Sequence, residues 1–544
     1  MSKFYLKPKF FSVMKDYSKE QFVKDLIAGI IVAIIALPLS IALALASGVA
    51  PEQGIYTAIA AGFVVSLLGG SRIQIAGPTA AFATIVAGIV ATEEMDGLFI
   101  ATIMAGIILI LMGVFKFGAL IKFIPYTITT GFTAGIAVTI FIGQIKDFLG
   151  ITYADGVKPI ETIEKLEANI EAMGSFSWQA LLVGAVCLAI LIVYPKFEKR
   201  IPPSLIAVIV GALMVKFIPV LDSGVSTIGE LYTIPTGLPK VDFGSFDFSL
   251  QKISAVLPSA FTIAVLAAIE SLLSCVVADG MVNSKHNPNA ELVAQGAANI
   301  ASVLFGGIPA TGAIARTAAN AKNGGKTPVA GMVHSLVLLL VLLFLMPLAG
   351  LIPMPTIAAI LFMVAYNMSE WKKFVRTVKT APVFDILVMV VTFLLTVIFD
   401  LVVAIEVGMI LTAVLFLKRM SDESKVKEWS KQDEGSITIP EDIMVYEISG
   451  PMFFGAADKI AEIAPNESTR CIVLRMGSVN AIDATALNSL ESIFEKCSAN
   501  GIKVAFSHVN DQPMSAMKKS GLFEKVGAEN FYPHIGNAID SLKL

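Results

Sequence analysis

The residues from Leu26 to Ser47 form a run of 22 without a single ionisable side chain. A helix of that length rises about 33 Å, which is enough to cross the hydrocarbon core of a bilayer. Comparable apolar runs recur as far as Leu417, and 56% of the residues are hydrophobic whereas only 15% are charged. That balance does not fit an ordinary soluble protein. The greater part of the chain is therefore predicted to lie in a membrane.

The distribution of Lys and Arg indicates the number and direction of the crossings. Fourteen spans, with the N-terminus inside, place Arg72, Lys116, Lys285 and the WKKFVRTVK segment that begins at Trp371 on the cytoplasmic side. We therefore expect an integral protein of the inner membrane with both termini in the cytoplasm. Four parts are expected: a cytosolic N-terminal segment at 1–24, a transmembrane transport domain at 25–420, a linker at 421–436 and a small soluble α/β domain at 437–544.

An internal repeat is readable in the sequence. The stretch LLGGSRIQIAGPTA at Leu67–Ala80 has a counterpart 237 residues later, LFGGIPATGAIART at Leu304–Thr317. Both copies have a Gly-Gly step, a further Gly and Pro, and then small residues. The offset makes Thr79 correspond to Arg316. Because seven is an odd number of spans, two halves of seven run in opposite directions across the membrane, which is an inverted repeat.

The Gly and Pro residues of both copies interrupt hydrophobic spans. Backbone that leaves the helix inside a bilayer must be buried in protein or line a watery cavity. We expect an extended stretch at Ile73–Ala76 and a half-helix that begins at Gly77-Pro78, because Pro suits the first helical position. A second half-helix is expected to begin near 313–316. Two positive helix N-termini that face one cavity favour an anion; plain kinking of two helices is the alternative.

Arg316 lies among Ala and Thr in a nearly charge-free stretch. A cation near the middle of a membrane is costly unless it is paired or hydrated. We predict that its guanidinium binds the anion, with the Thr79 hydroxyl and nearby backbone N–H groups completing the site. A structural ion pair, or a side chain that reaches toward the interface, is the alternative.

Glu270 lies in the middle of the apolar segment VLPSAFTIAVLAAIESLLSCVVAD. Burial disfavours an ionised carboxylate, so Glu270 can carry a proton, whereas a nearby Arg316 would favour the ionised form. Three roles stay open on the residues alone: carrier of a coupling proton, permanent partner of Arg316, and Na⁺ ligand together with Ser274. In the first span, Pro38 and a series of small residues predict close packing, and Leu39, Ser40 and Leu43 are expected to wall the cavity and touch substrate.

Several function classes are not expected from the sequence. It contains no phosphate-binding loop, nucleotide fingerprint, metal-ligand spacing or nucleophile triad, so neither an enzyme nor a bound cofactor or metal is predicted. A clustered basic stripe of the kind that binds nucleic acid is also missing. The predicted partners are a small inorganic or carboxylate anion and the lipid bilayer.

Over nearly its whole length the chain resembles the SulP anion transporters, also called solute carrier family 26. The resemblance rests on ALPLSIALALASGVAPEQGIY in the first span, on SRIQIAGPTA, and on the long stretch from Ala268 to Gly331. The segment VLRMGSVNAIDATAL resembles the STAS domain, which sulfate transporters share with anti-sigma factor antagonists. This domain implies a regulator with a cytosolic protein partner.

The resemblance implies an all-α membrane domain of the uracil-transporter type, with seven spans plus seven, whose core moves against a gate as an elevator and which forms a homodimer. It implies that the anion lies between the broken third and tenth spans, at Thr79, Ala80, Ala313, Ala315 and Arg316. Glu270 matches an acidic position in the eighth span where relatives with Glu resemble proton-coupled transporters and some with Asp resemble sodium-coupled ones. The coupling ion is therefore expected to be H⁺, with Na⁺ as the alternative.

Two positions depart from the family's pattern. Leu39 stands where many relatives have Gln, which removes a polar contact to substrate. Ala484-Thr485-Ala486 stands where the STAS phosphorylation loop reads Asp-Ser-Ser/Thr-Gly, so Thr485 is a candidate phosphate acceptor and Asp483 a helix cap.

The expected function is H⁺-coupled uptake of sulfate or a related oxyanion. Symport of a C4-dicarboxylate or bicarbonate with H⁺ or Na⁺, an uncoupled anion channel or exchanger, and a receptor that reports anion occupancy through the STAS domain are the alternatives.

Overall fold

The computed structural model describes residues 6–119, 125–154, 156–157, 159–198, 201–232, 249–399, 401–429, 439–466 and 468–542. The chain divides into two compact units, Met1–Met409 and Ile410–Leu544. The division falls inside one helix, α19 (Leu401–Glu423).

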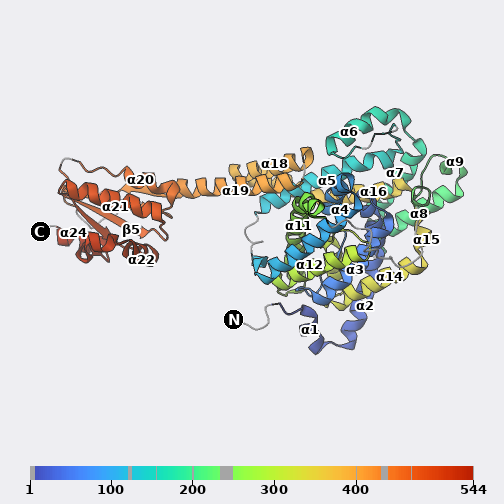
Figure 1. Ribbon diagram of the computed structural model, residues 1–544, viewed down its shortest axis with the longest axis horizontal. Coiled ribbons are helices and arrows are strands. Elements are labelled where there is room, and N and C mark those ends of the chain that lie inside the picture. The colour runs from blue at the N-terminus through green and yellow to red at the C-terminus, as the bar shows by residue number, and fades with distance from the viewer. Residues whose placement is uncertain are drawn as a thin grey trace. The chain divides into compact units, whose positions relative to one another are not determined.

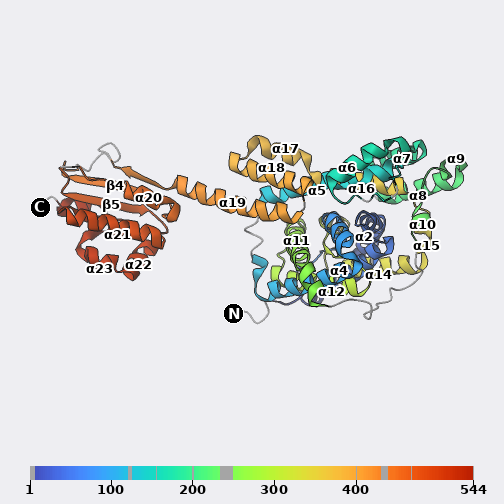
Figure 2. The same ribbon diagram turned by 45° about the horizontal axis from the view of Figure 1, so that its top comes forward.

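The helices of the first unit form two bundles. The first bundle joins segments from both sequence repeats, so that the blue helices of Figure 1 lie among the green and yellow ones. It contains α2 (Lys19–Ala46), α3 (Pro51–Leu68), α4 (Ala80–Val114), α11 (Leu250–Val282), α12 (Pro288–Leu304), α13 (Ile314–Lys322) and α14 (Val329–Phe344). In the second bundle, α5 (Tyr126–Leu149) packs against α16 (Met354–Ser369) and α18 (Val383–Ile398), and α7 (Trp178–Val193) packs against α8 (Pro203–Phe217) and α16. Figure 2 shows these helices above the first bundle.

The second bundle consists of α5 (Tyr126–Leu149), α7 (Trp178–Val193), α8 (Pro203–Phe217), α16 (Met354–Ser369) and α18 (Val383–Ile398). Short helices connect the elements of the unit: α1 (Lys9–Val13), α6 (Thr162–Glu171), α9 (Pro219–Asp222), α10 (Ile228–Leu231), α15 (Met346–Ala349) and α17 (Trp371–Thr380).

Five helical stretches in the described part of the chain are long and apolar enough to cross a membrane, and α8, α14 and α18 are shorter apolar helices. One of the five, α4, would be about 52 Å long if it were straight, which exceeds the thickness of the hydrocarbon core. Glu94 breaks it with a positive φ of 61°. An ion pair of 3.1 Å between Glu93 and Lys252 fastens this turn to the start of α11. Thus α4 consists of two helical segments, and the total of fourteen spans stays a prediction.

The second unit is built around a five-stranded sheet of order β3-β4-β5-β6-β7. Only β3 is antiparallel to its neighbour; the other pairs are parallel. The strands are β3 (Lys425–Glu428), β4 (Ile443–Ser449), β5 (Cys471–Ser478), β6 (Lys503–Ser507) and β7 (Phe531–Tyr532), and the helices are α20 (Ala457–Ala461), α21 (Ala484–Ala499), α22 (Asp511–Ser520), α23 (Leu522–Val526) and α24 (Ile535–Leu542).

Alternation along β5 gives this sheet two buried faces. Ile472 and Leu474 belong to one apolar cluster together with residues of α21, whereas Val473 belongs to another together with residues of α24. The segment at 421–436, expected to be a linker, contributes the edge strand β3, and its residues from 430 onward lie outside the described ranges.

Candidate functional site

The two sequence repeats meet in the first bundle. Ala76–Gly77 of the first copy (β1) and Thr311–Gly312 of the second (β2) form a short antiparallel pair. The backbone N–H of Ala313 also donates to the carbonyl of Ile75 (2.8 Å). Each broken segment therefore satisfies part of the backbone of the other, as non-helical chain within a bilayer requires.

Polar side chains of neighbouring helices satisfy further backbone groups of these segments. Asn299 both donates to and accepts from the backbone of Ala310 at 2.9 Å, and Asn320 donates to the carbonyl of Ile73 (2.9 Å). Thr317 accepts from the N–H of Ile75 (3.0 Å). These buried residues were missed as contributors to the site. Their signal in the sequence is the presence of amides and hydroxyls within otherwise apolar helices.

The half-helices begin at different positions of the repeat. The second, α13, begins at Ile314, within the expected range. The first, α4, begins at Ala80 with Thr79 as its N-cap residue, so the prediction that Pro78 would be its first helical residue is wrong. The reason is that Gly77 is held in the β1–β2 pair and the helix starts only after it. No side chain in the described part of the chain caps either N-terminus, which leaves N–H groups for a ligand.

Arg316 lies in the first turn of α13 and is only 1% exposed. Its Nη2 donates to the carbonyl oxygen of Pro78, the residue before Thr79. Its Nε and Nη1 have no hydrogen-bond partner in the described part of the chain. A Cβ at position 77 would collide with Nη1, so Gly77 provides the space for the guanidinium. The side chain thus links the starts of both half-helices.

Glu270 accepts a hydrogen bond at 2.9 Å from the hydroxyl of Thr79. Within the described residues it forms no ion pair with Arg316, so the alternative of a direct Glu270–Arg316 pair is not observed. Ser274, one turn further along α11, is fully buried and its hydroxyl contacts that of Thr317 at 3.4 Å. No group of three or more His, Cys, Asp or Glu in the described ranges is placed to hold a metal ion.

The other residues that are predicted to touch the substrate differ in their exposure. Leu43 and Ser40 of α2 are buried in the first bundle, and the Ser40 hydroxyl has no partner in the described part of the chain. Leu39 is partly exposed. At the half-helix starts Ala80 and Ala313 are each 7% exposed, whereas Ala315 is exposed.

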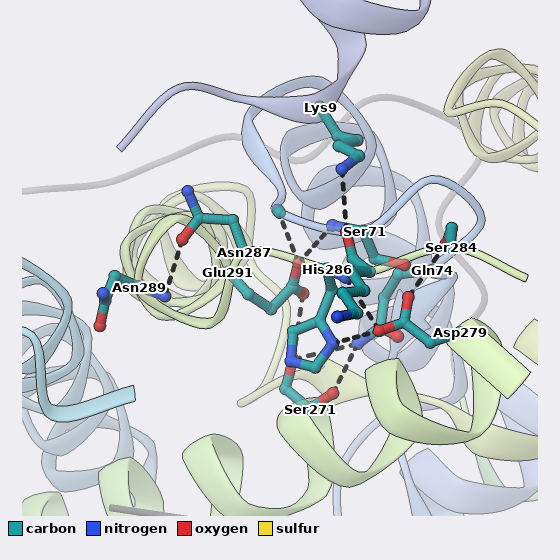
Figure 3. A network of polar contacts seen from close by, with 12 residues as sticks. Lys9, Ser71, Gln74, Ser271, Asp279, Ser284, His286, Asn287, Asn289 and Glu291 are labelled. Carbon is teal, nitrogen blue, oxygen red and sulfur yellow. Dashed lines mark hydrogen bonds and ion pairs between the residues drawn. The ribbon is translucent and has the colours of Figure 1, made fainter. Parts of the chain in front are cut away.

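A second polar cluster lies next to the broken segment (Figure 3). Glu291 of α12 is fully buried. It accepts from the backbone N–H groups of Gly70 (2.8 Å) and Ser71 (3.3 Å) and from the side chains of Ser271 (3.1 Å) and Gln295 (3.2 Å). Ser271 directly follows Glu270. The Glu291 carboxylate therefore holds both the segment that leads into β1 and α11, the helix that carries Glu270.

In the second unit Asp483 is the N-cap of α21: its Oδ1 accepts from the N–H of Ala486 (2.9 Å), and its Oδ2 accepts from the N–H of Phe454 (2.8 Å). Thr485 is exposed in the first turn of the same helix. The structure therefore gives Asp483 the predicted helix-start role, while phosphorylation of Thr485 stays a prediction.

Two known protein families match the chain, one in each of the two units. Residues 22–392 match the model of the sulfate permease family, and residues 436–538 match the STAS domain. The putative sulfate transporter YvdB of Bacillus subtilis is 40% identical over 529 residues, which cover 96% of this chain and 98% of the relative. The bicarbonate transporter BicA of Picosynechococcus sp. is 32% identical, covering 95% and 96%.

Two solved structures have a similar fold. Murine Slc26a9, an anion transporter in the inward-facing state, has a TM-score of 0.89 at 16% identity, covering 99% of this chain and 94% of its own. The transmembrane domain of a cyanobacterial BicA has a TM-score of 0.62 at 29% identity, covering 72% and 98%. Fold, site and relatives together define a membrane transporter of small anions, not an enzyme. The chain belongs to the sulfate permease family and carries a C-terminal STAS domain.

Proposed function

We propose that the chain takes up sulfate or a related oxyanion together with a proton. The observation that carries this proposal is the hydrogen bond of 2.9 Å from Thr79 to Glu270. Thr79 is also the N-cap of α4, and the residue before it binds Arg316. Thr79 thus connects the acid Glu270 to Arg316 and to two helix N-termini that no described side chain caps. The cation and the two N-termini are the groups that attract an anion.

Proton coupling follows from electrostatics at this site. Two like charges about 6 Å apart repel by about 3 kcal/mol at an effective dielectric constant of about 20, which is on the order of 100-fold in affinity. An ionised Glu270 therefore opposes anion binding, and a proton on Glu270 removes that repulsion. Proton and anion consequently favour each other's binding, which is the requirement for symport.

A proton fits Glu270 better than Na⁺ does. Sodium coupling requires several oxygen ligands around the ion, and Ser274 is the nearby candidate in the same helix. Its hydroxyl instead contacts Thr317 at 3.4 Å inside the bundle. This arrangement favours H⁺ as the coupling ion.

The substrate class is proposed from the site and from the relatives. The guanidinium of Arg316 has two N–H-bearing nitrogens, Nε and Nη1, without partners among the described residues, which suits the oxygen atoms of an oxyanion. The name of YvdB supports sulfate, and the name of BicA makes bicarbonate the second candidate. The aliphatic Leu39, which is predicted to wall the site, adds no polar contact, so in this proposal binding rests on the half-helices and Arg316.

For movement we propose an elevator, in which the first bundle carries the anion past the second. The bundles are internally well packed and touch mainly where α2 meets α8 and α16 and where α4 meets α5. A cross-link that ties α2 to α16 is expected to stop uptake, whereas one that joins α5 to α16 within the second bundle is expected to spare it. We further propose a homodimer in the inner membrane with cytoplasmic termini, and a cytosolic protein partner at the STAS domain.

The proposal is tested with purified protein in proteoliposomes under an inward proton gradient. Radiolabelled sulfate, bicarbonate, succinate and fumarate are offered at two pH values, and accumulation of sulfate at the lower external pH is expected. Glu270→Gln is expected to abolish accumulation while thermal stabilisation by the anion persists. The control Glu406→Gln removes an exposed carboxylate from α19 and should accumulate normally. Concentrative uptake by Glu270→Gln that equals the wild type contradicts proton coupling, and large single-channel currents would indicate a channel.

A further inference from the structure

The connection between α16 and α18 is the short helix α17, of sequence WKKFVRTVKT (Figure 2). One side of α17 packs on the protein: the ring of Phe374 lies 5.5 Å from that of Phe393 in α18, and Thr377 is buried. Lys373 is paired with Glu370 (2.7 Å) and lies 4.6 Å above the ring of Tyr126 in α5. These contacts fix the rotation of the helix, and so decide which of its residues face outward.

Next to the packed side lies an open apolar strip. Trp371, Val375 and Val378 are 48%, 41% and 39% exposed. Their spacing of i, i+4 and i+7 places them on one face of the helix. An exposed apolar strip that contains Trp is typical of a helix that lies in the boundary between lipid and water.

A basic strip runs beside the apolar one. Lys372, Arg376 and Lys379 are exposed and repeat the spacing of i, i+4 and i+7, each one residue further along than its apolar counterpart. Within the described ranges none of the three forms an ion pair, in contrast to Lys373. Three exposed cations thus follow the edge of an exposed apolar strip.

We propose that α17 is a binding site for anionic phospholipid headgroups. Both ends of α17 continue into apolar helices of the second bundle, α16 and α18, so it is held at the level where a membrane span ends. In that position Trp371 and the valines contact the acyl boundary while the three cations meet headgroup phosphates. A lipid surface offers apolar chains and negative charge side by side, which complement the apolar strip and the basic strip of α17. The site is independent of the proposed substrate and of the coupling ion.

The expected preference can be worked from the charges. One cation near an anionic surface favours association about fivefold, so three give on the order of 100-fold tighter binding of phosphatidylglycerol than of phosphatidylcholine. The test titrates each lipid into the full-length protein in detergent micelles and follows binding by native mass spectrometry and by thermal unfolding. The triple variant Lys372→Gln, Arg376→Gln, Lys379→Gln is expected to lose the preference to within about threefold.

A control variant removes the same number of exposed cations from the soluble domain: Lys425→Gln, Lys427→Gln and Lys519→Gln. It is expected to keep the full preference. Val375→Ser with Val378→Ser should weaken lipid binding, and inorganic phosphate at equal concentration should not compete, because a free anion uses only the basic strip. The proposal is overturned if the triple variant on α17 binds phosphatidylglycerol like the wild type, or if both triple variants lose the preference for phosphatidylglycerol to the same extent. Competition by inorganic phosphate or soluble polyglutamate, with no effect of the valine changes, would instead indicate an anion or acidic-peptide site.

Discussion

Glu291 offers a test of how the broken segment is held. Its carboxylate accepts four hydrogen bonds inside the first bundle, two of them from the backbone of Gly70 and Ser71. In Glu291→Leu the two backbone N–H groups lose their acceptor while they stay buried, at about 1–3 kcal/mol each. The variant is therefore expected to be less stable by about 2–6 kcal/mol. In Glu291→Gln the amide oxygen of the new side chain can still accept from the N–H groups of Gly70 and Ser71. Its NH₂ group can donate to Ser271 and Gln295, because a hydroxyl and a side-chain amide can each accept a hydrogen bond instead of donating one.

The assay is chemical unfolding of the full-length variants in detergent micelles, with sulfate uptake in proteoliposomes as the second measurement. Glu291→Gln is expected to remain within about 1.5 kcal/mol of the wild type and to retain uptake, whereas Glu291→Leu loses both stability and uptake. A Glu291→Leu variant as stable as the wild type would refute the reasoning, because it would mean that the carboxylate does not act as the acceptor for the backbone of the broken segment. A Gln variant as unstable as the Leu variant would show instead that the charge is required.

Three further predictions concern single side chains. Gly77→Ala places a Cβ against the buried guanidinium; at about 1–3 kcal/mol of overpacking it is expected to lower anion uptake at least fivefold, whereas Gly88→Ala, where no atom of the described residues lies within 4 Å of the added Cβ, leaves uptake unchanged. Thr79→Val removes the hydroxyl that contacts Glu270 and is expected to reduce uptake about 2- to 10-fold, from about 0.5–1.5 kcal/mol for a hydrogen bond to the protonated acid, while Thr79→Ser retains it. Burial raises the pKa of the Cys471 thiol to about 11, so iodoacetamide at pH 8 should alkylate it on the order of 100-fold more slowly than an ordinary thiol; fast labelling of the folded protein, read by peptide mass spectrometry, would contradict this.

Much of the architecture is local in origin and was therefore readable in the sequence. Apolar runs such as Leu26–Ser47 specify membrane helices because every backbone group in lipid must be satisfied within the segment. The repeat offset by 237 residues located the broken segments, and α13 begins within the range predicted for it. The soluble α/β domain and, separately, the helix cap at Asp483 were also predicted from the sequence. The edge strand β3 lies in the segment predicted to be a linker, because its four residues, KVKE, carry three charges.

The tertiary structure decided what the sequence left open, because those features depend on contacts between segments far apart in the chain. The helix α4 begins at Ala80 and not at the predicted Pro78, because Gly77 pairs with Thr311 of the other repeat. Burial of Glu270 in an apolar segment indicated an acid within the membrane, but only the folded chain directs the Thr79 hydroxyl to it and the Arg316 guanidinium to the carbonyl of Pro78. The sequence by itself thus determined a membrane protein with two broken, repeated segments, and their crossing determined which groups meet at the site.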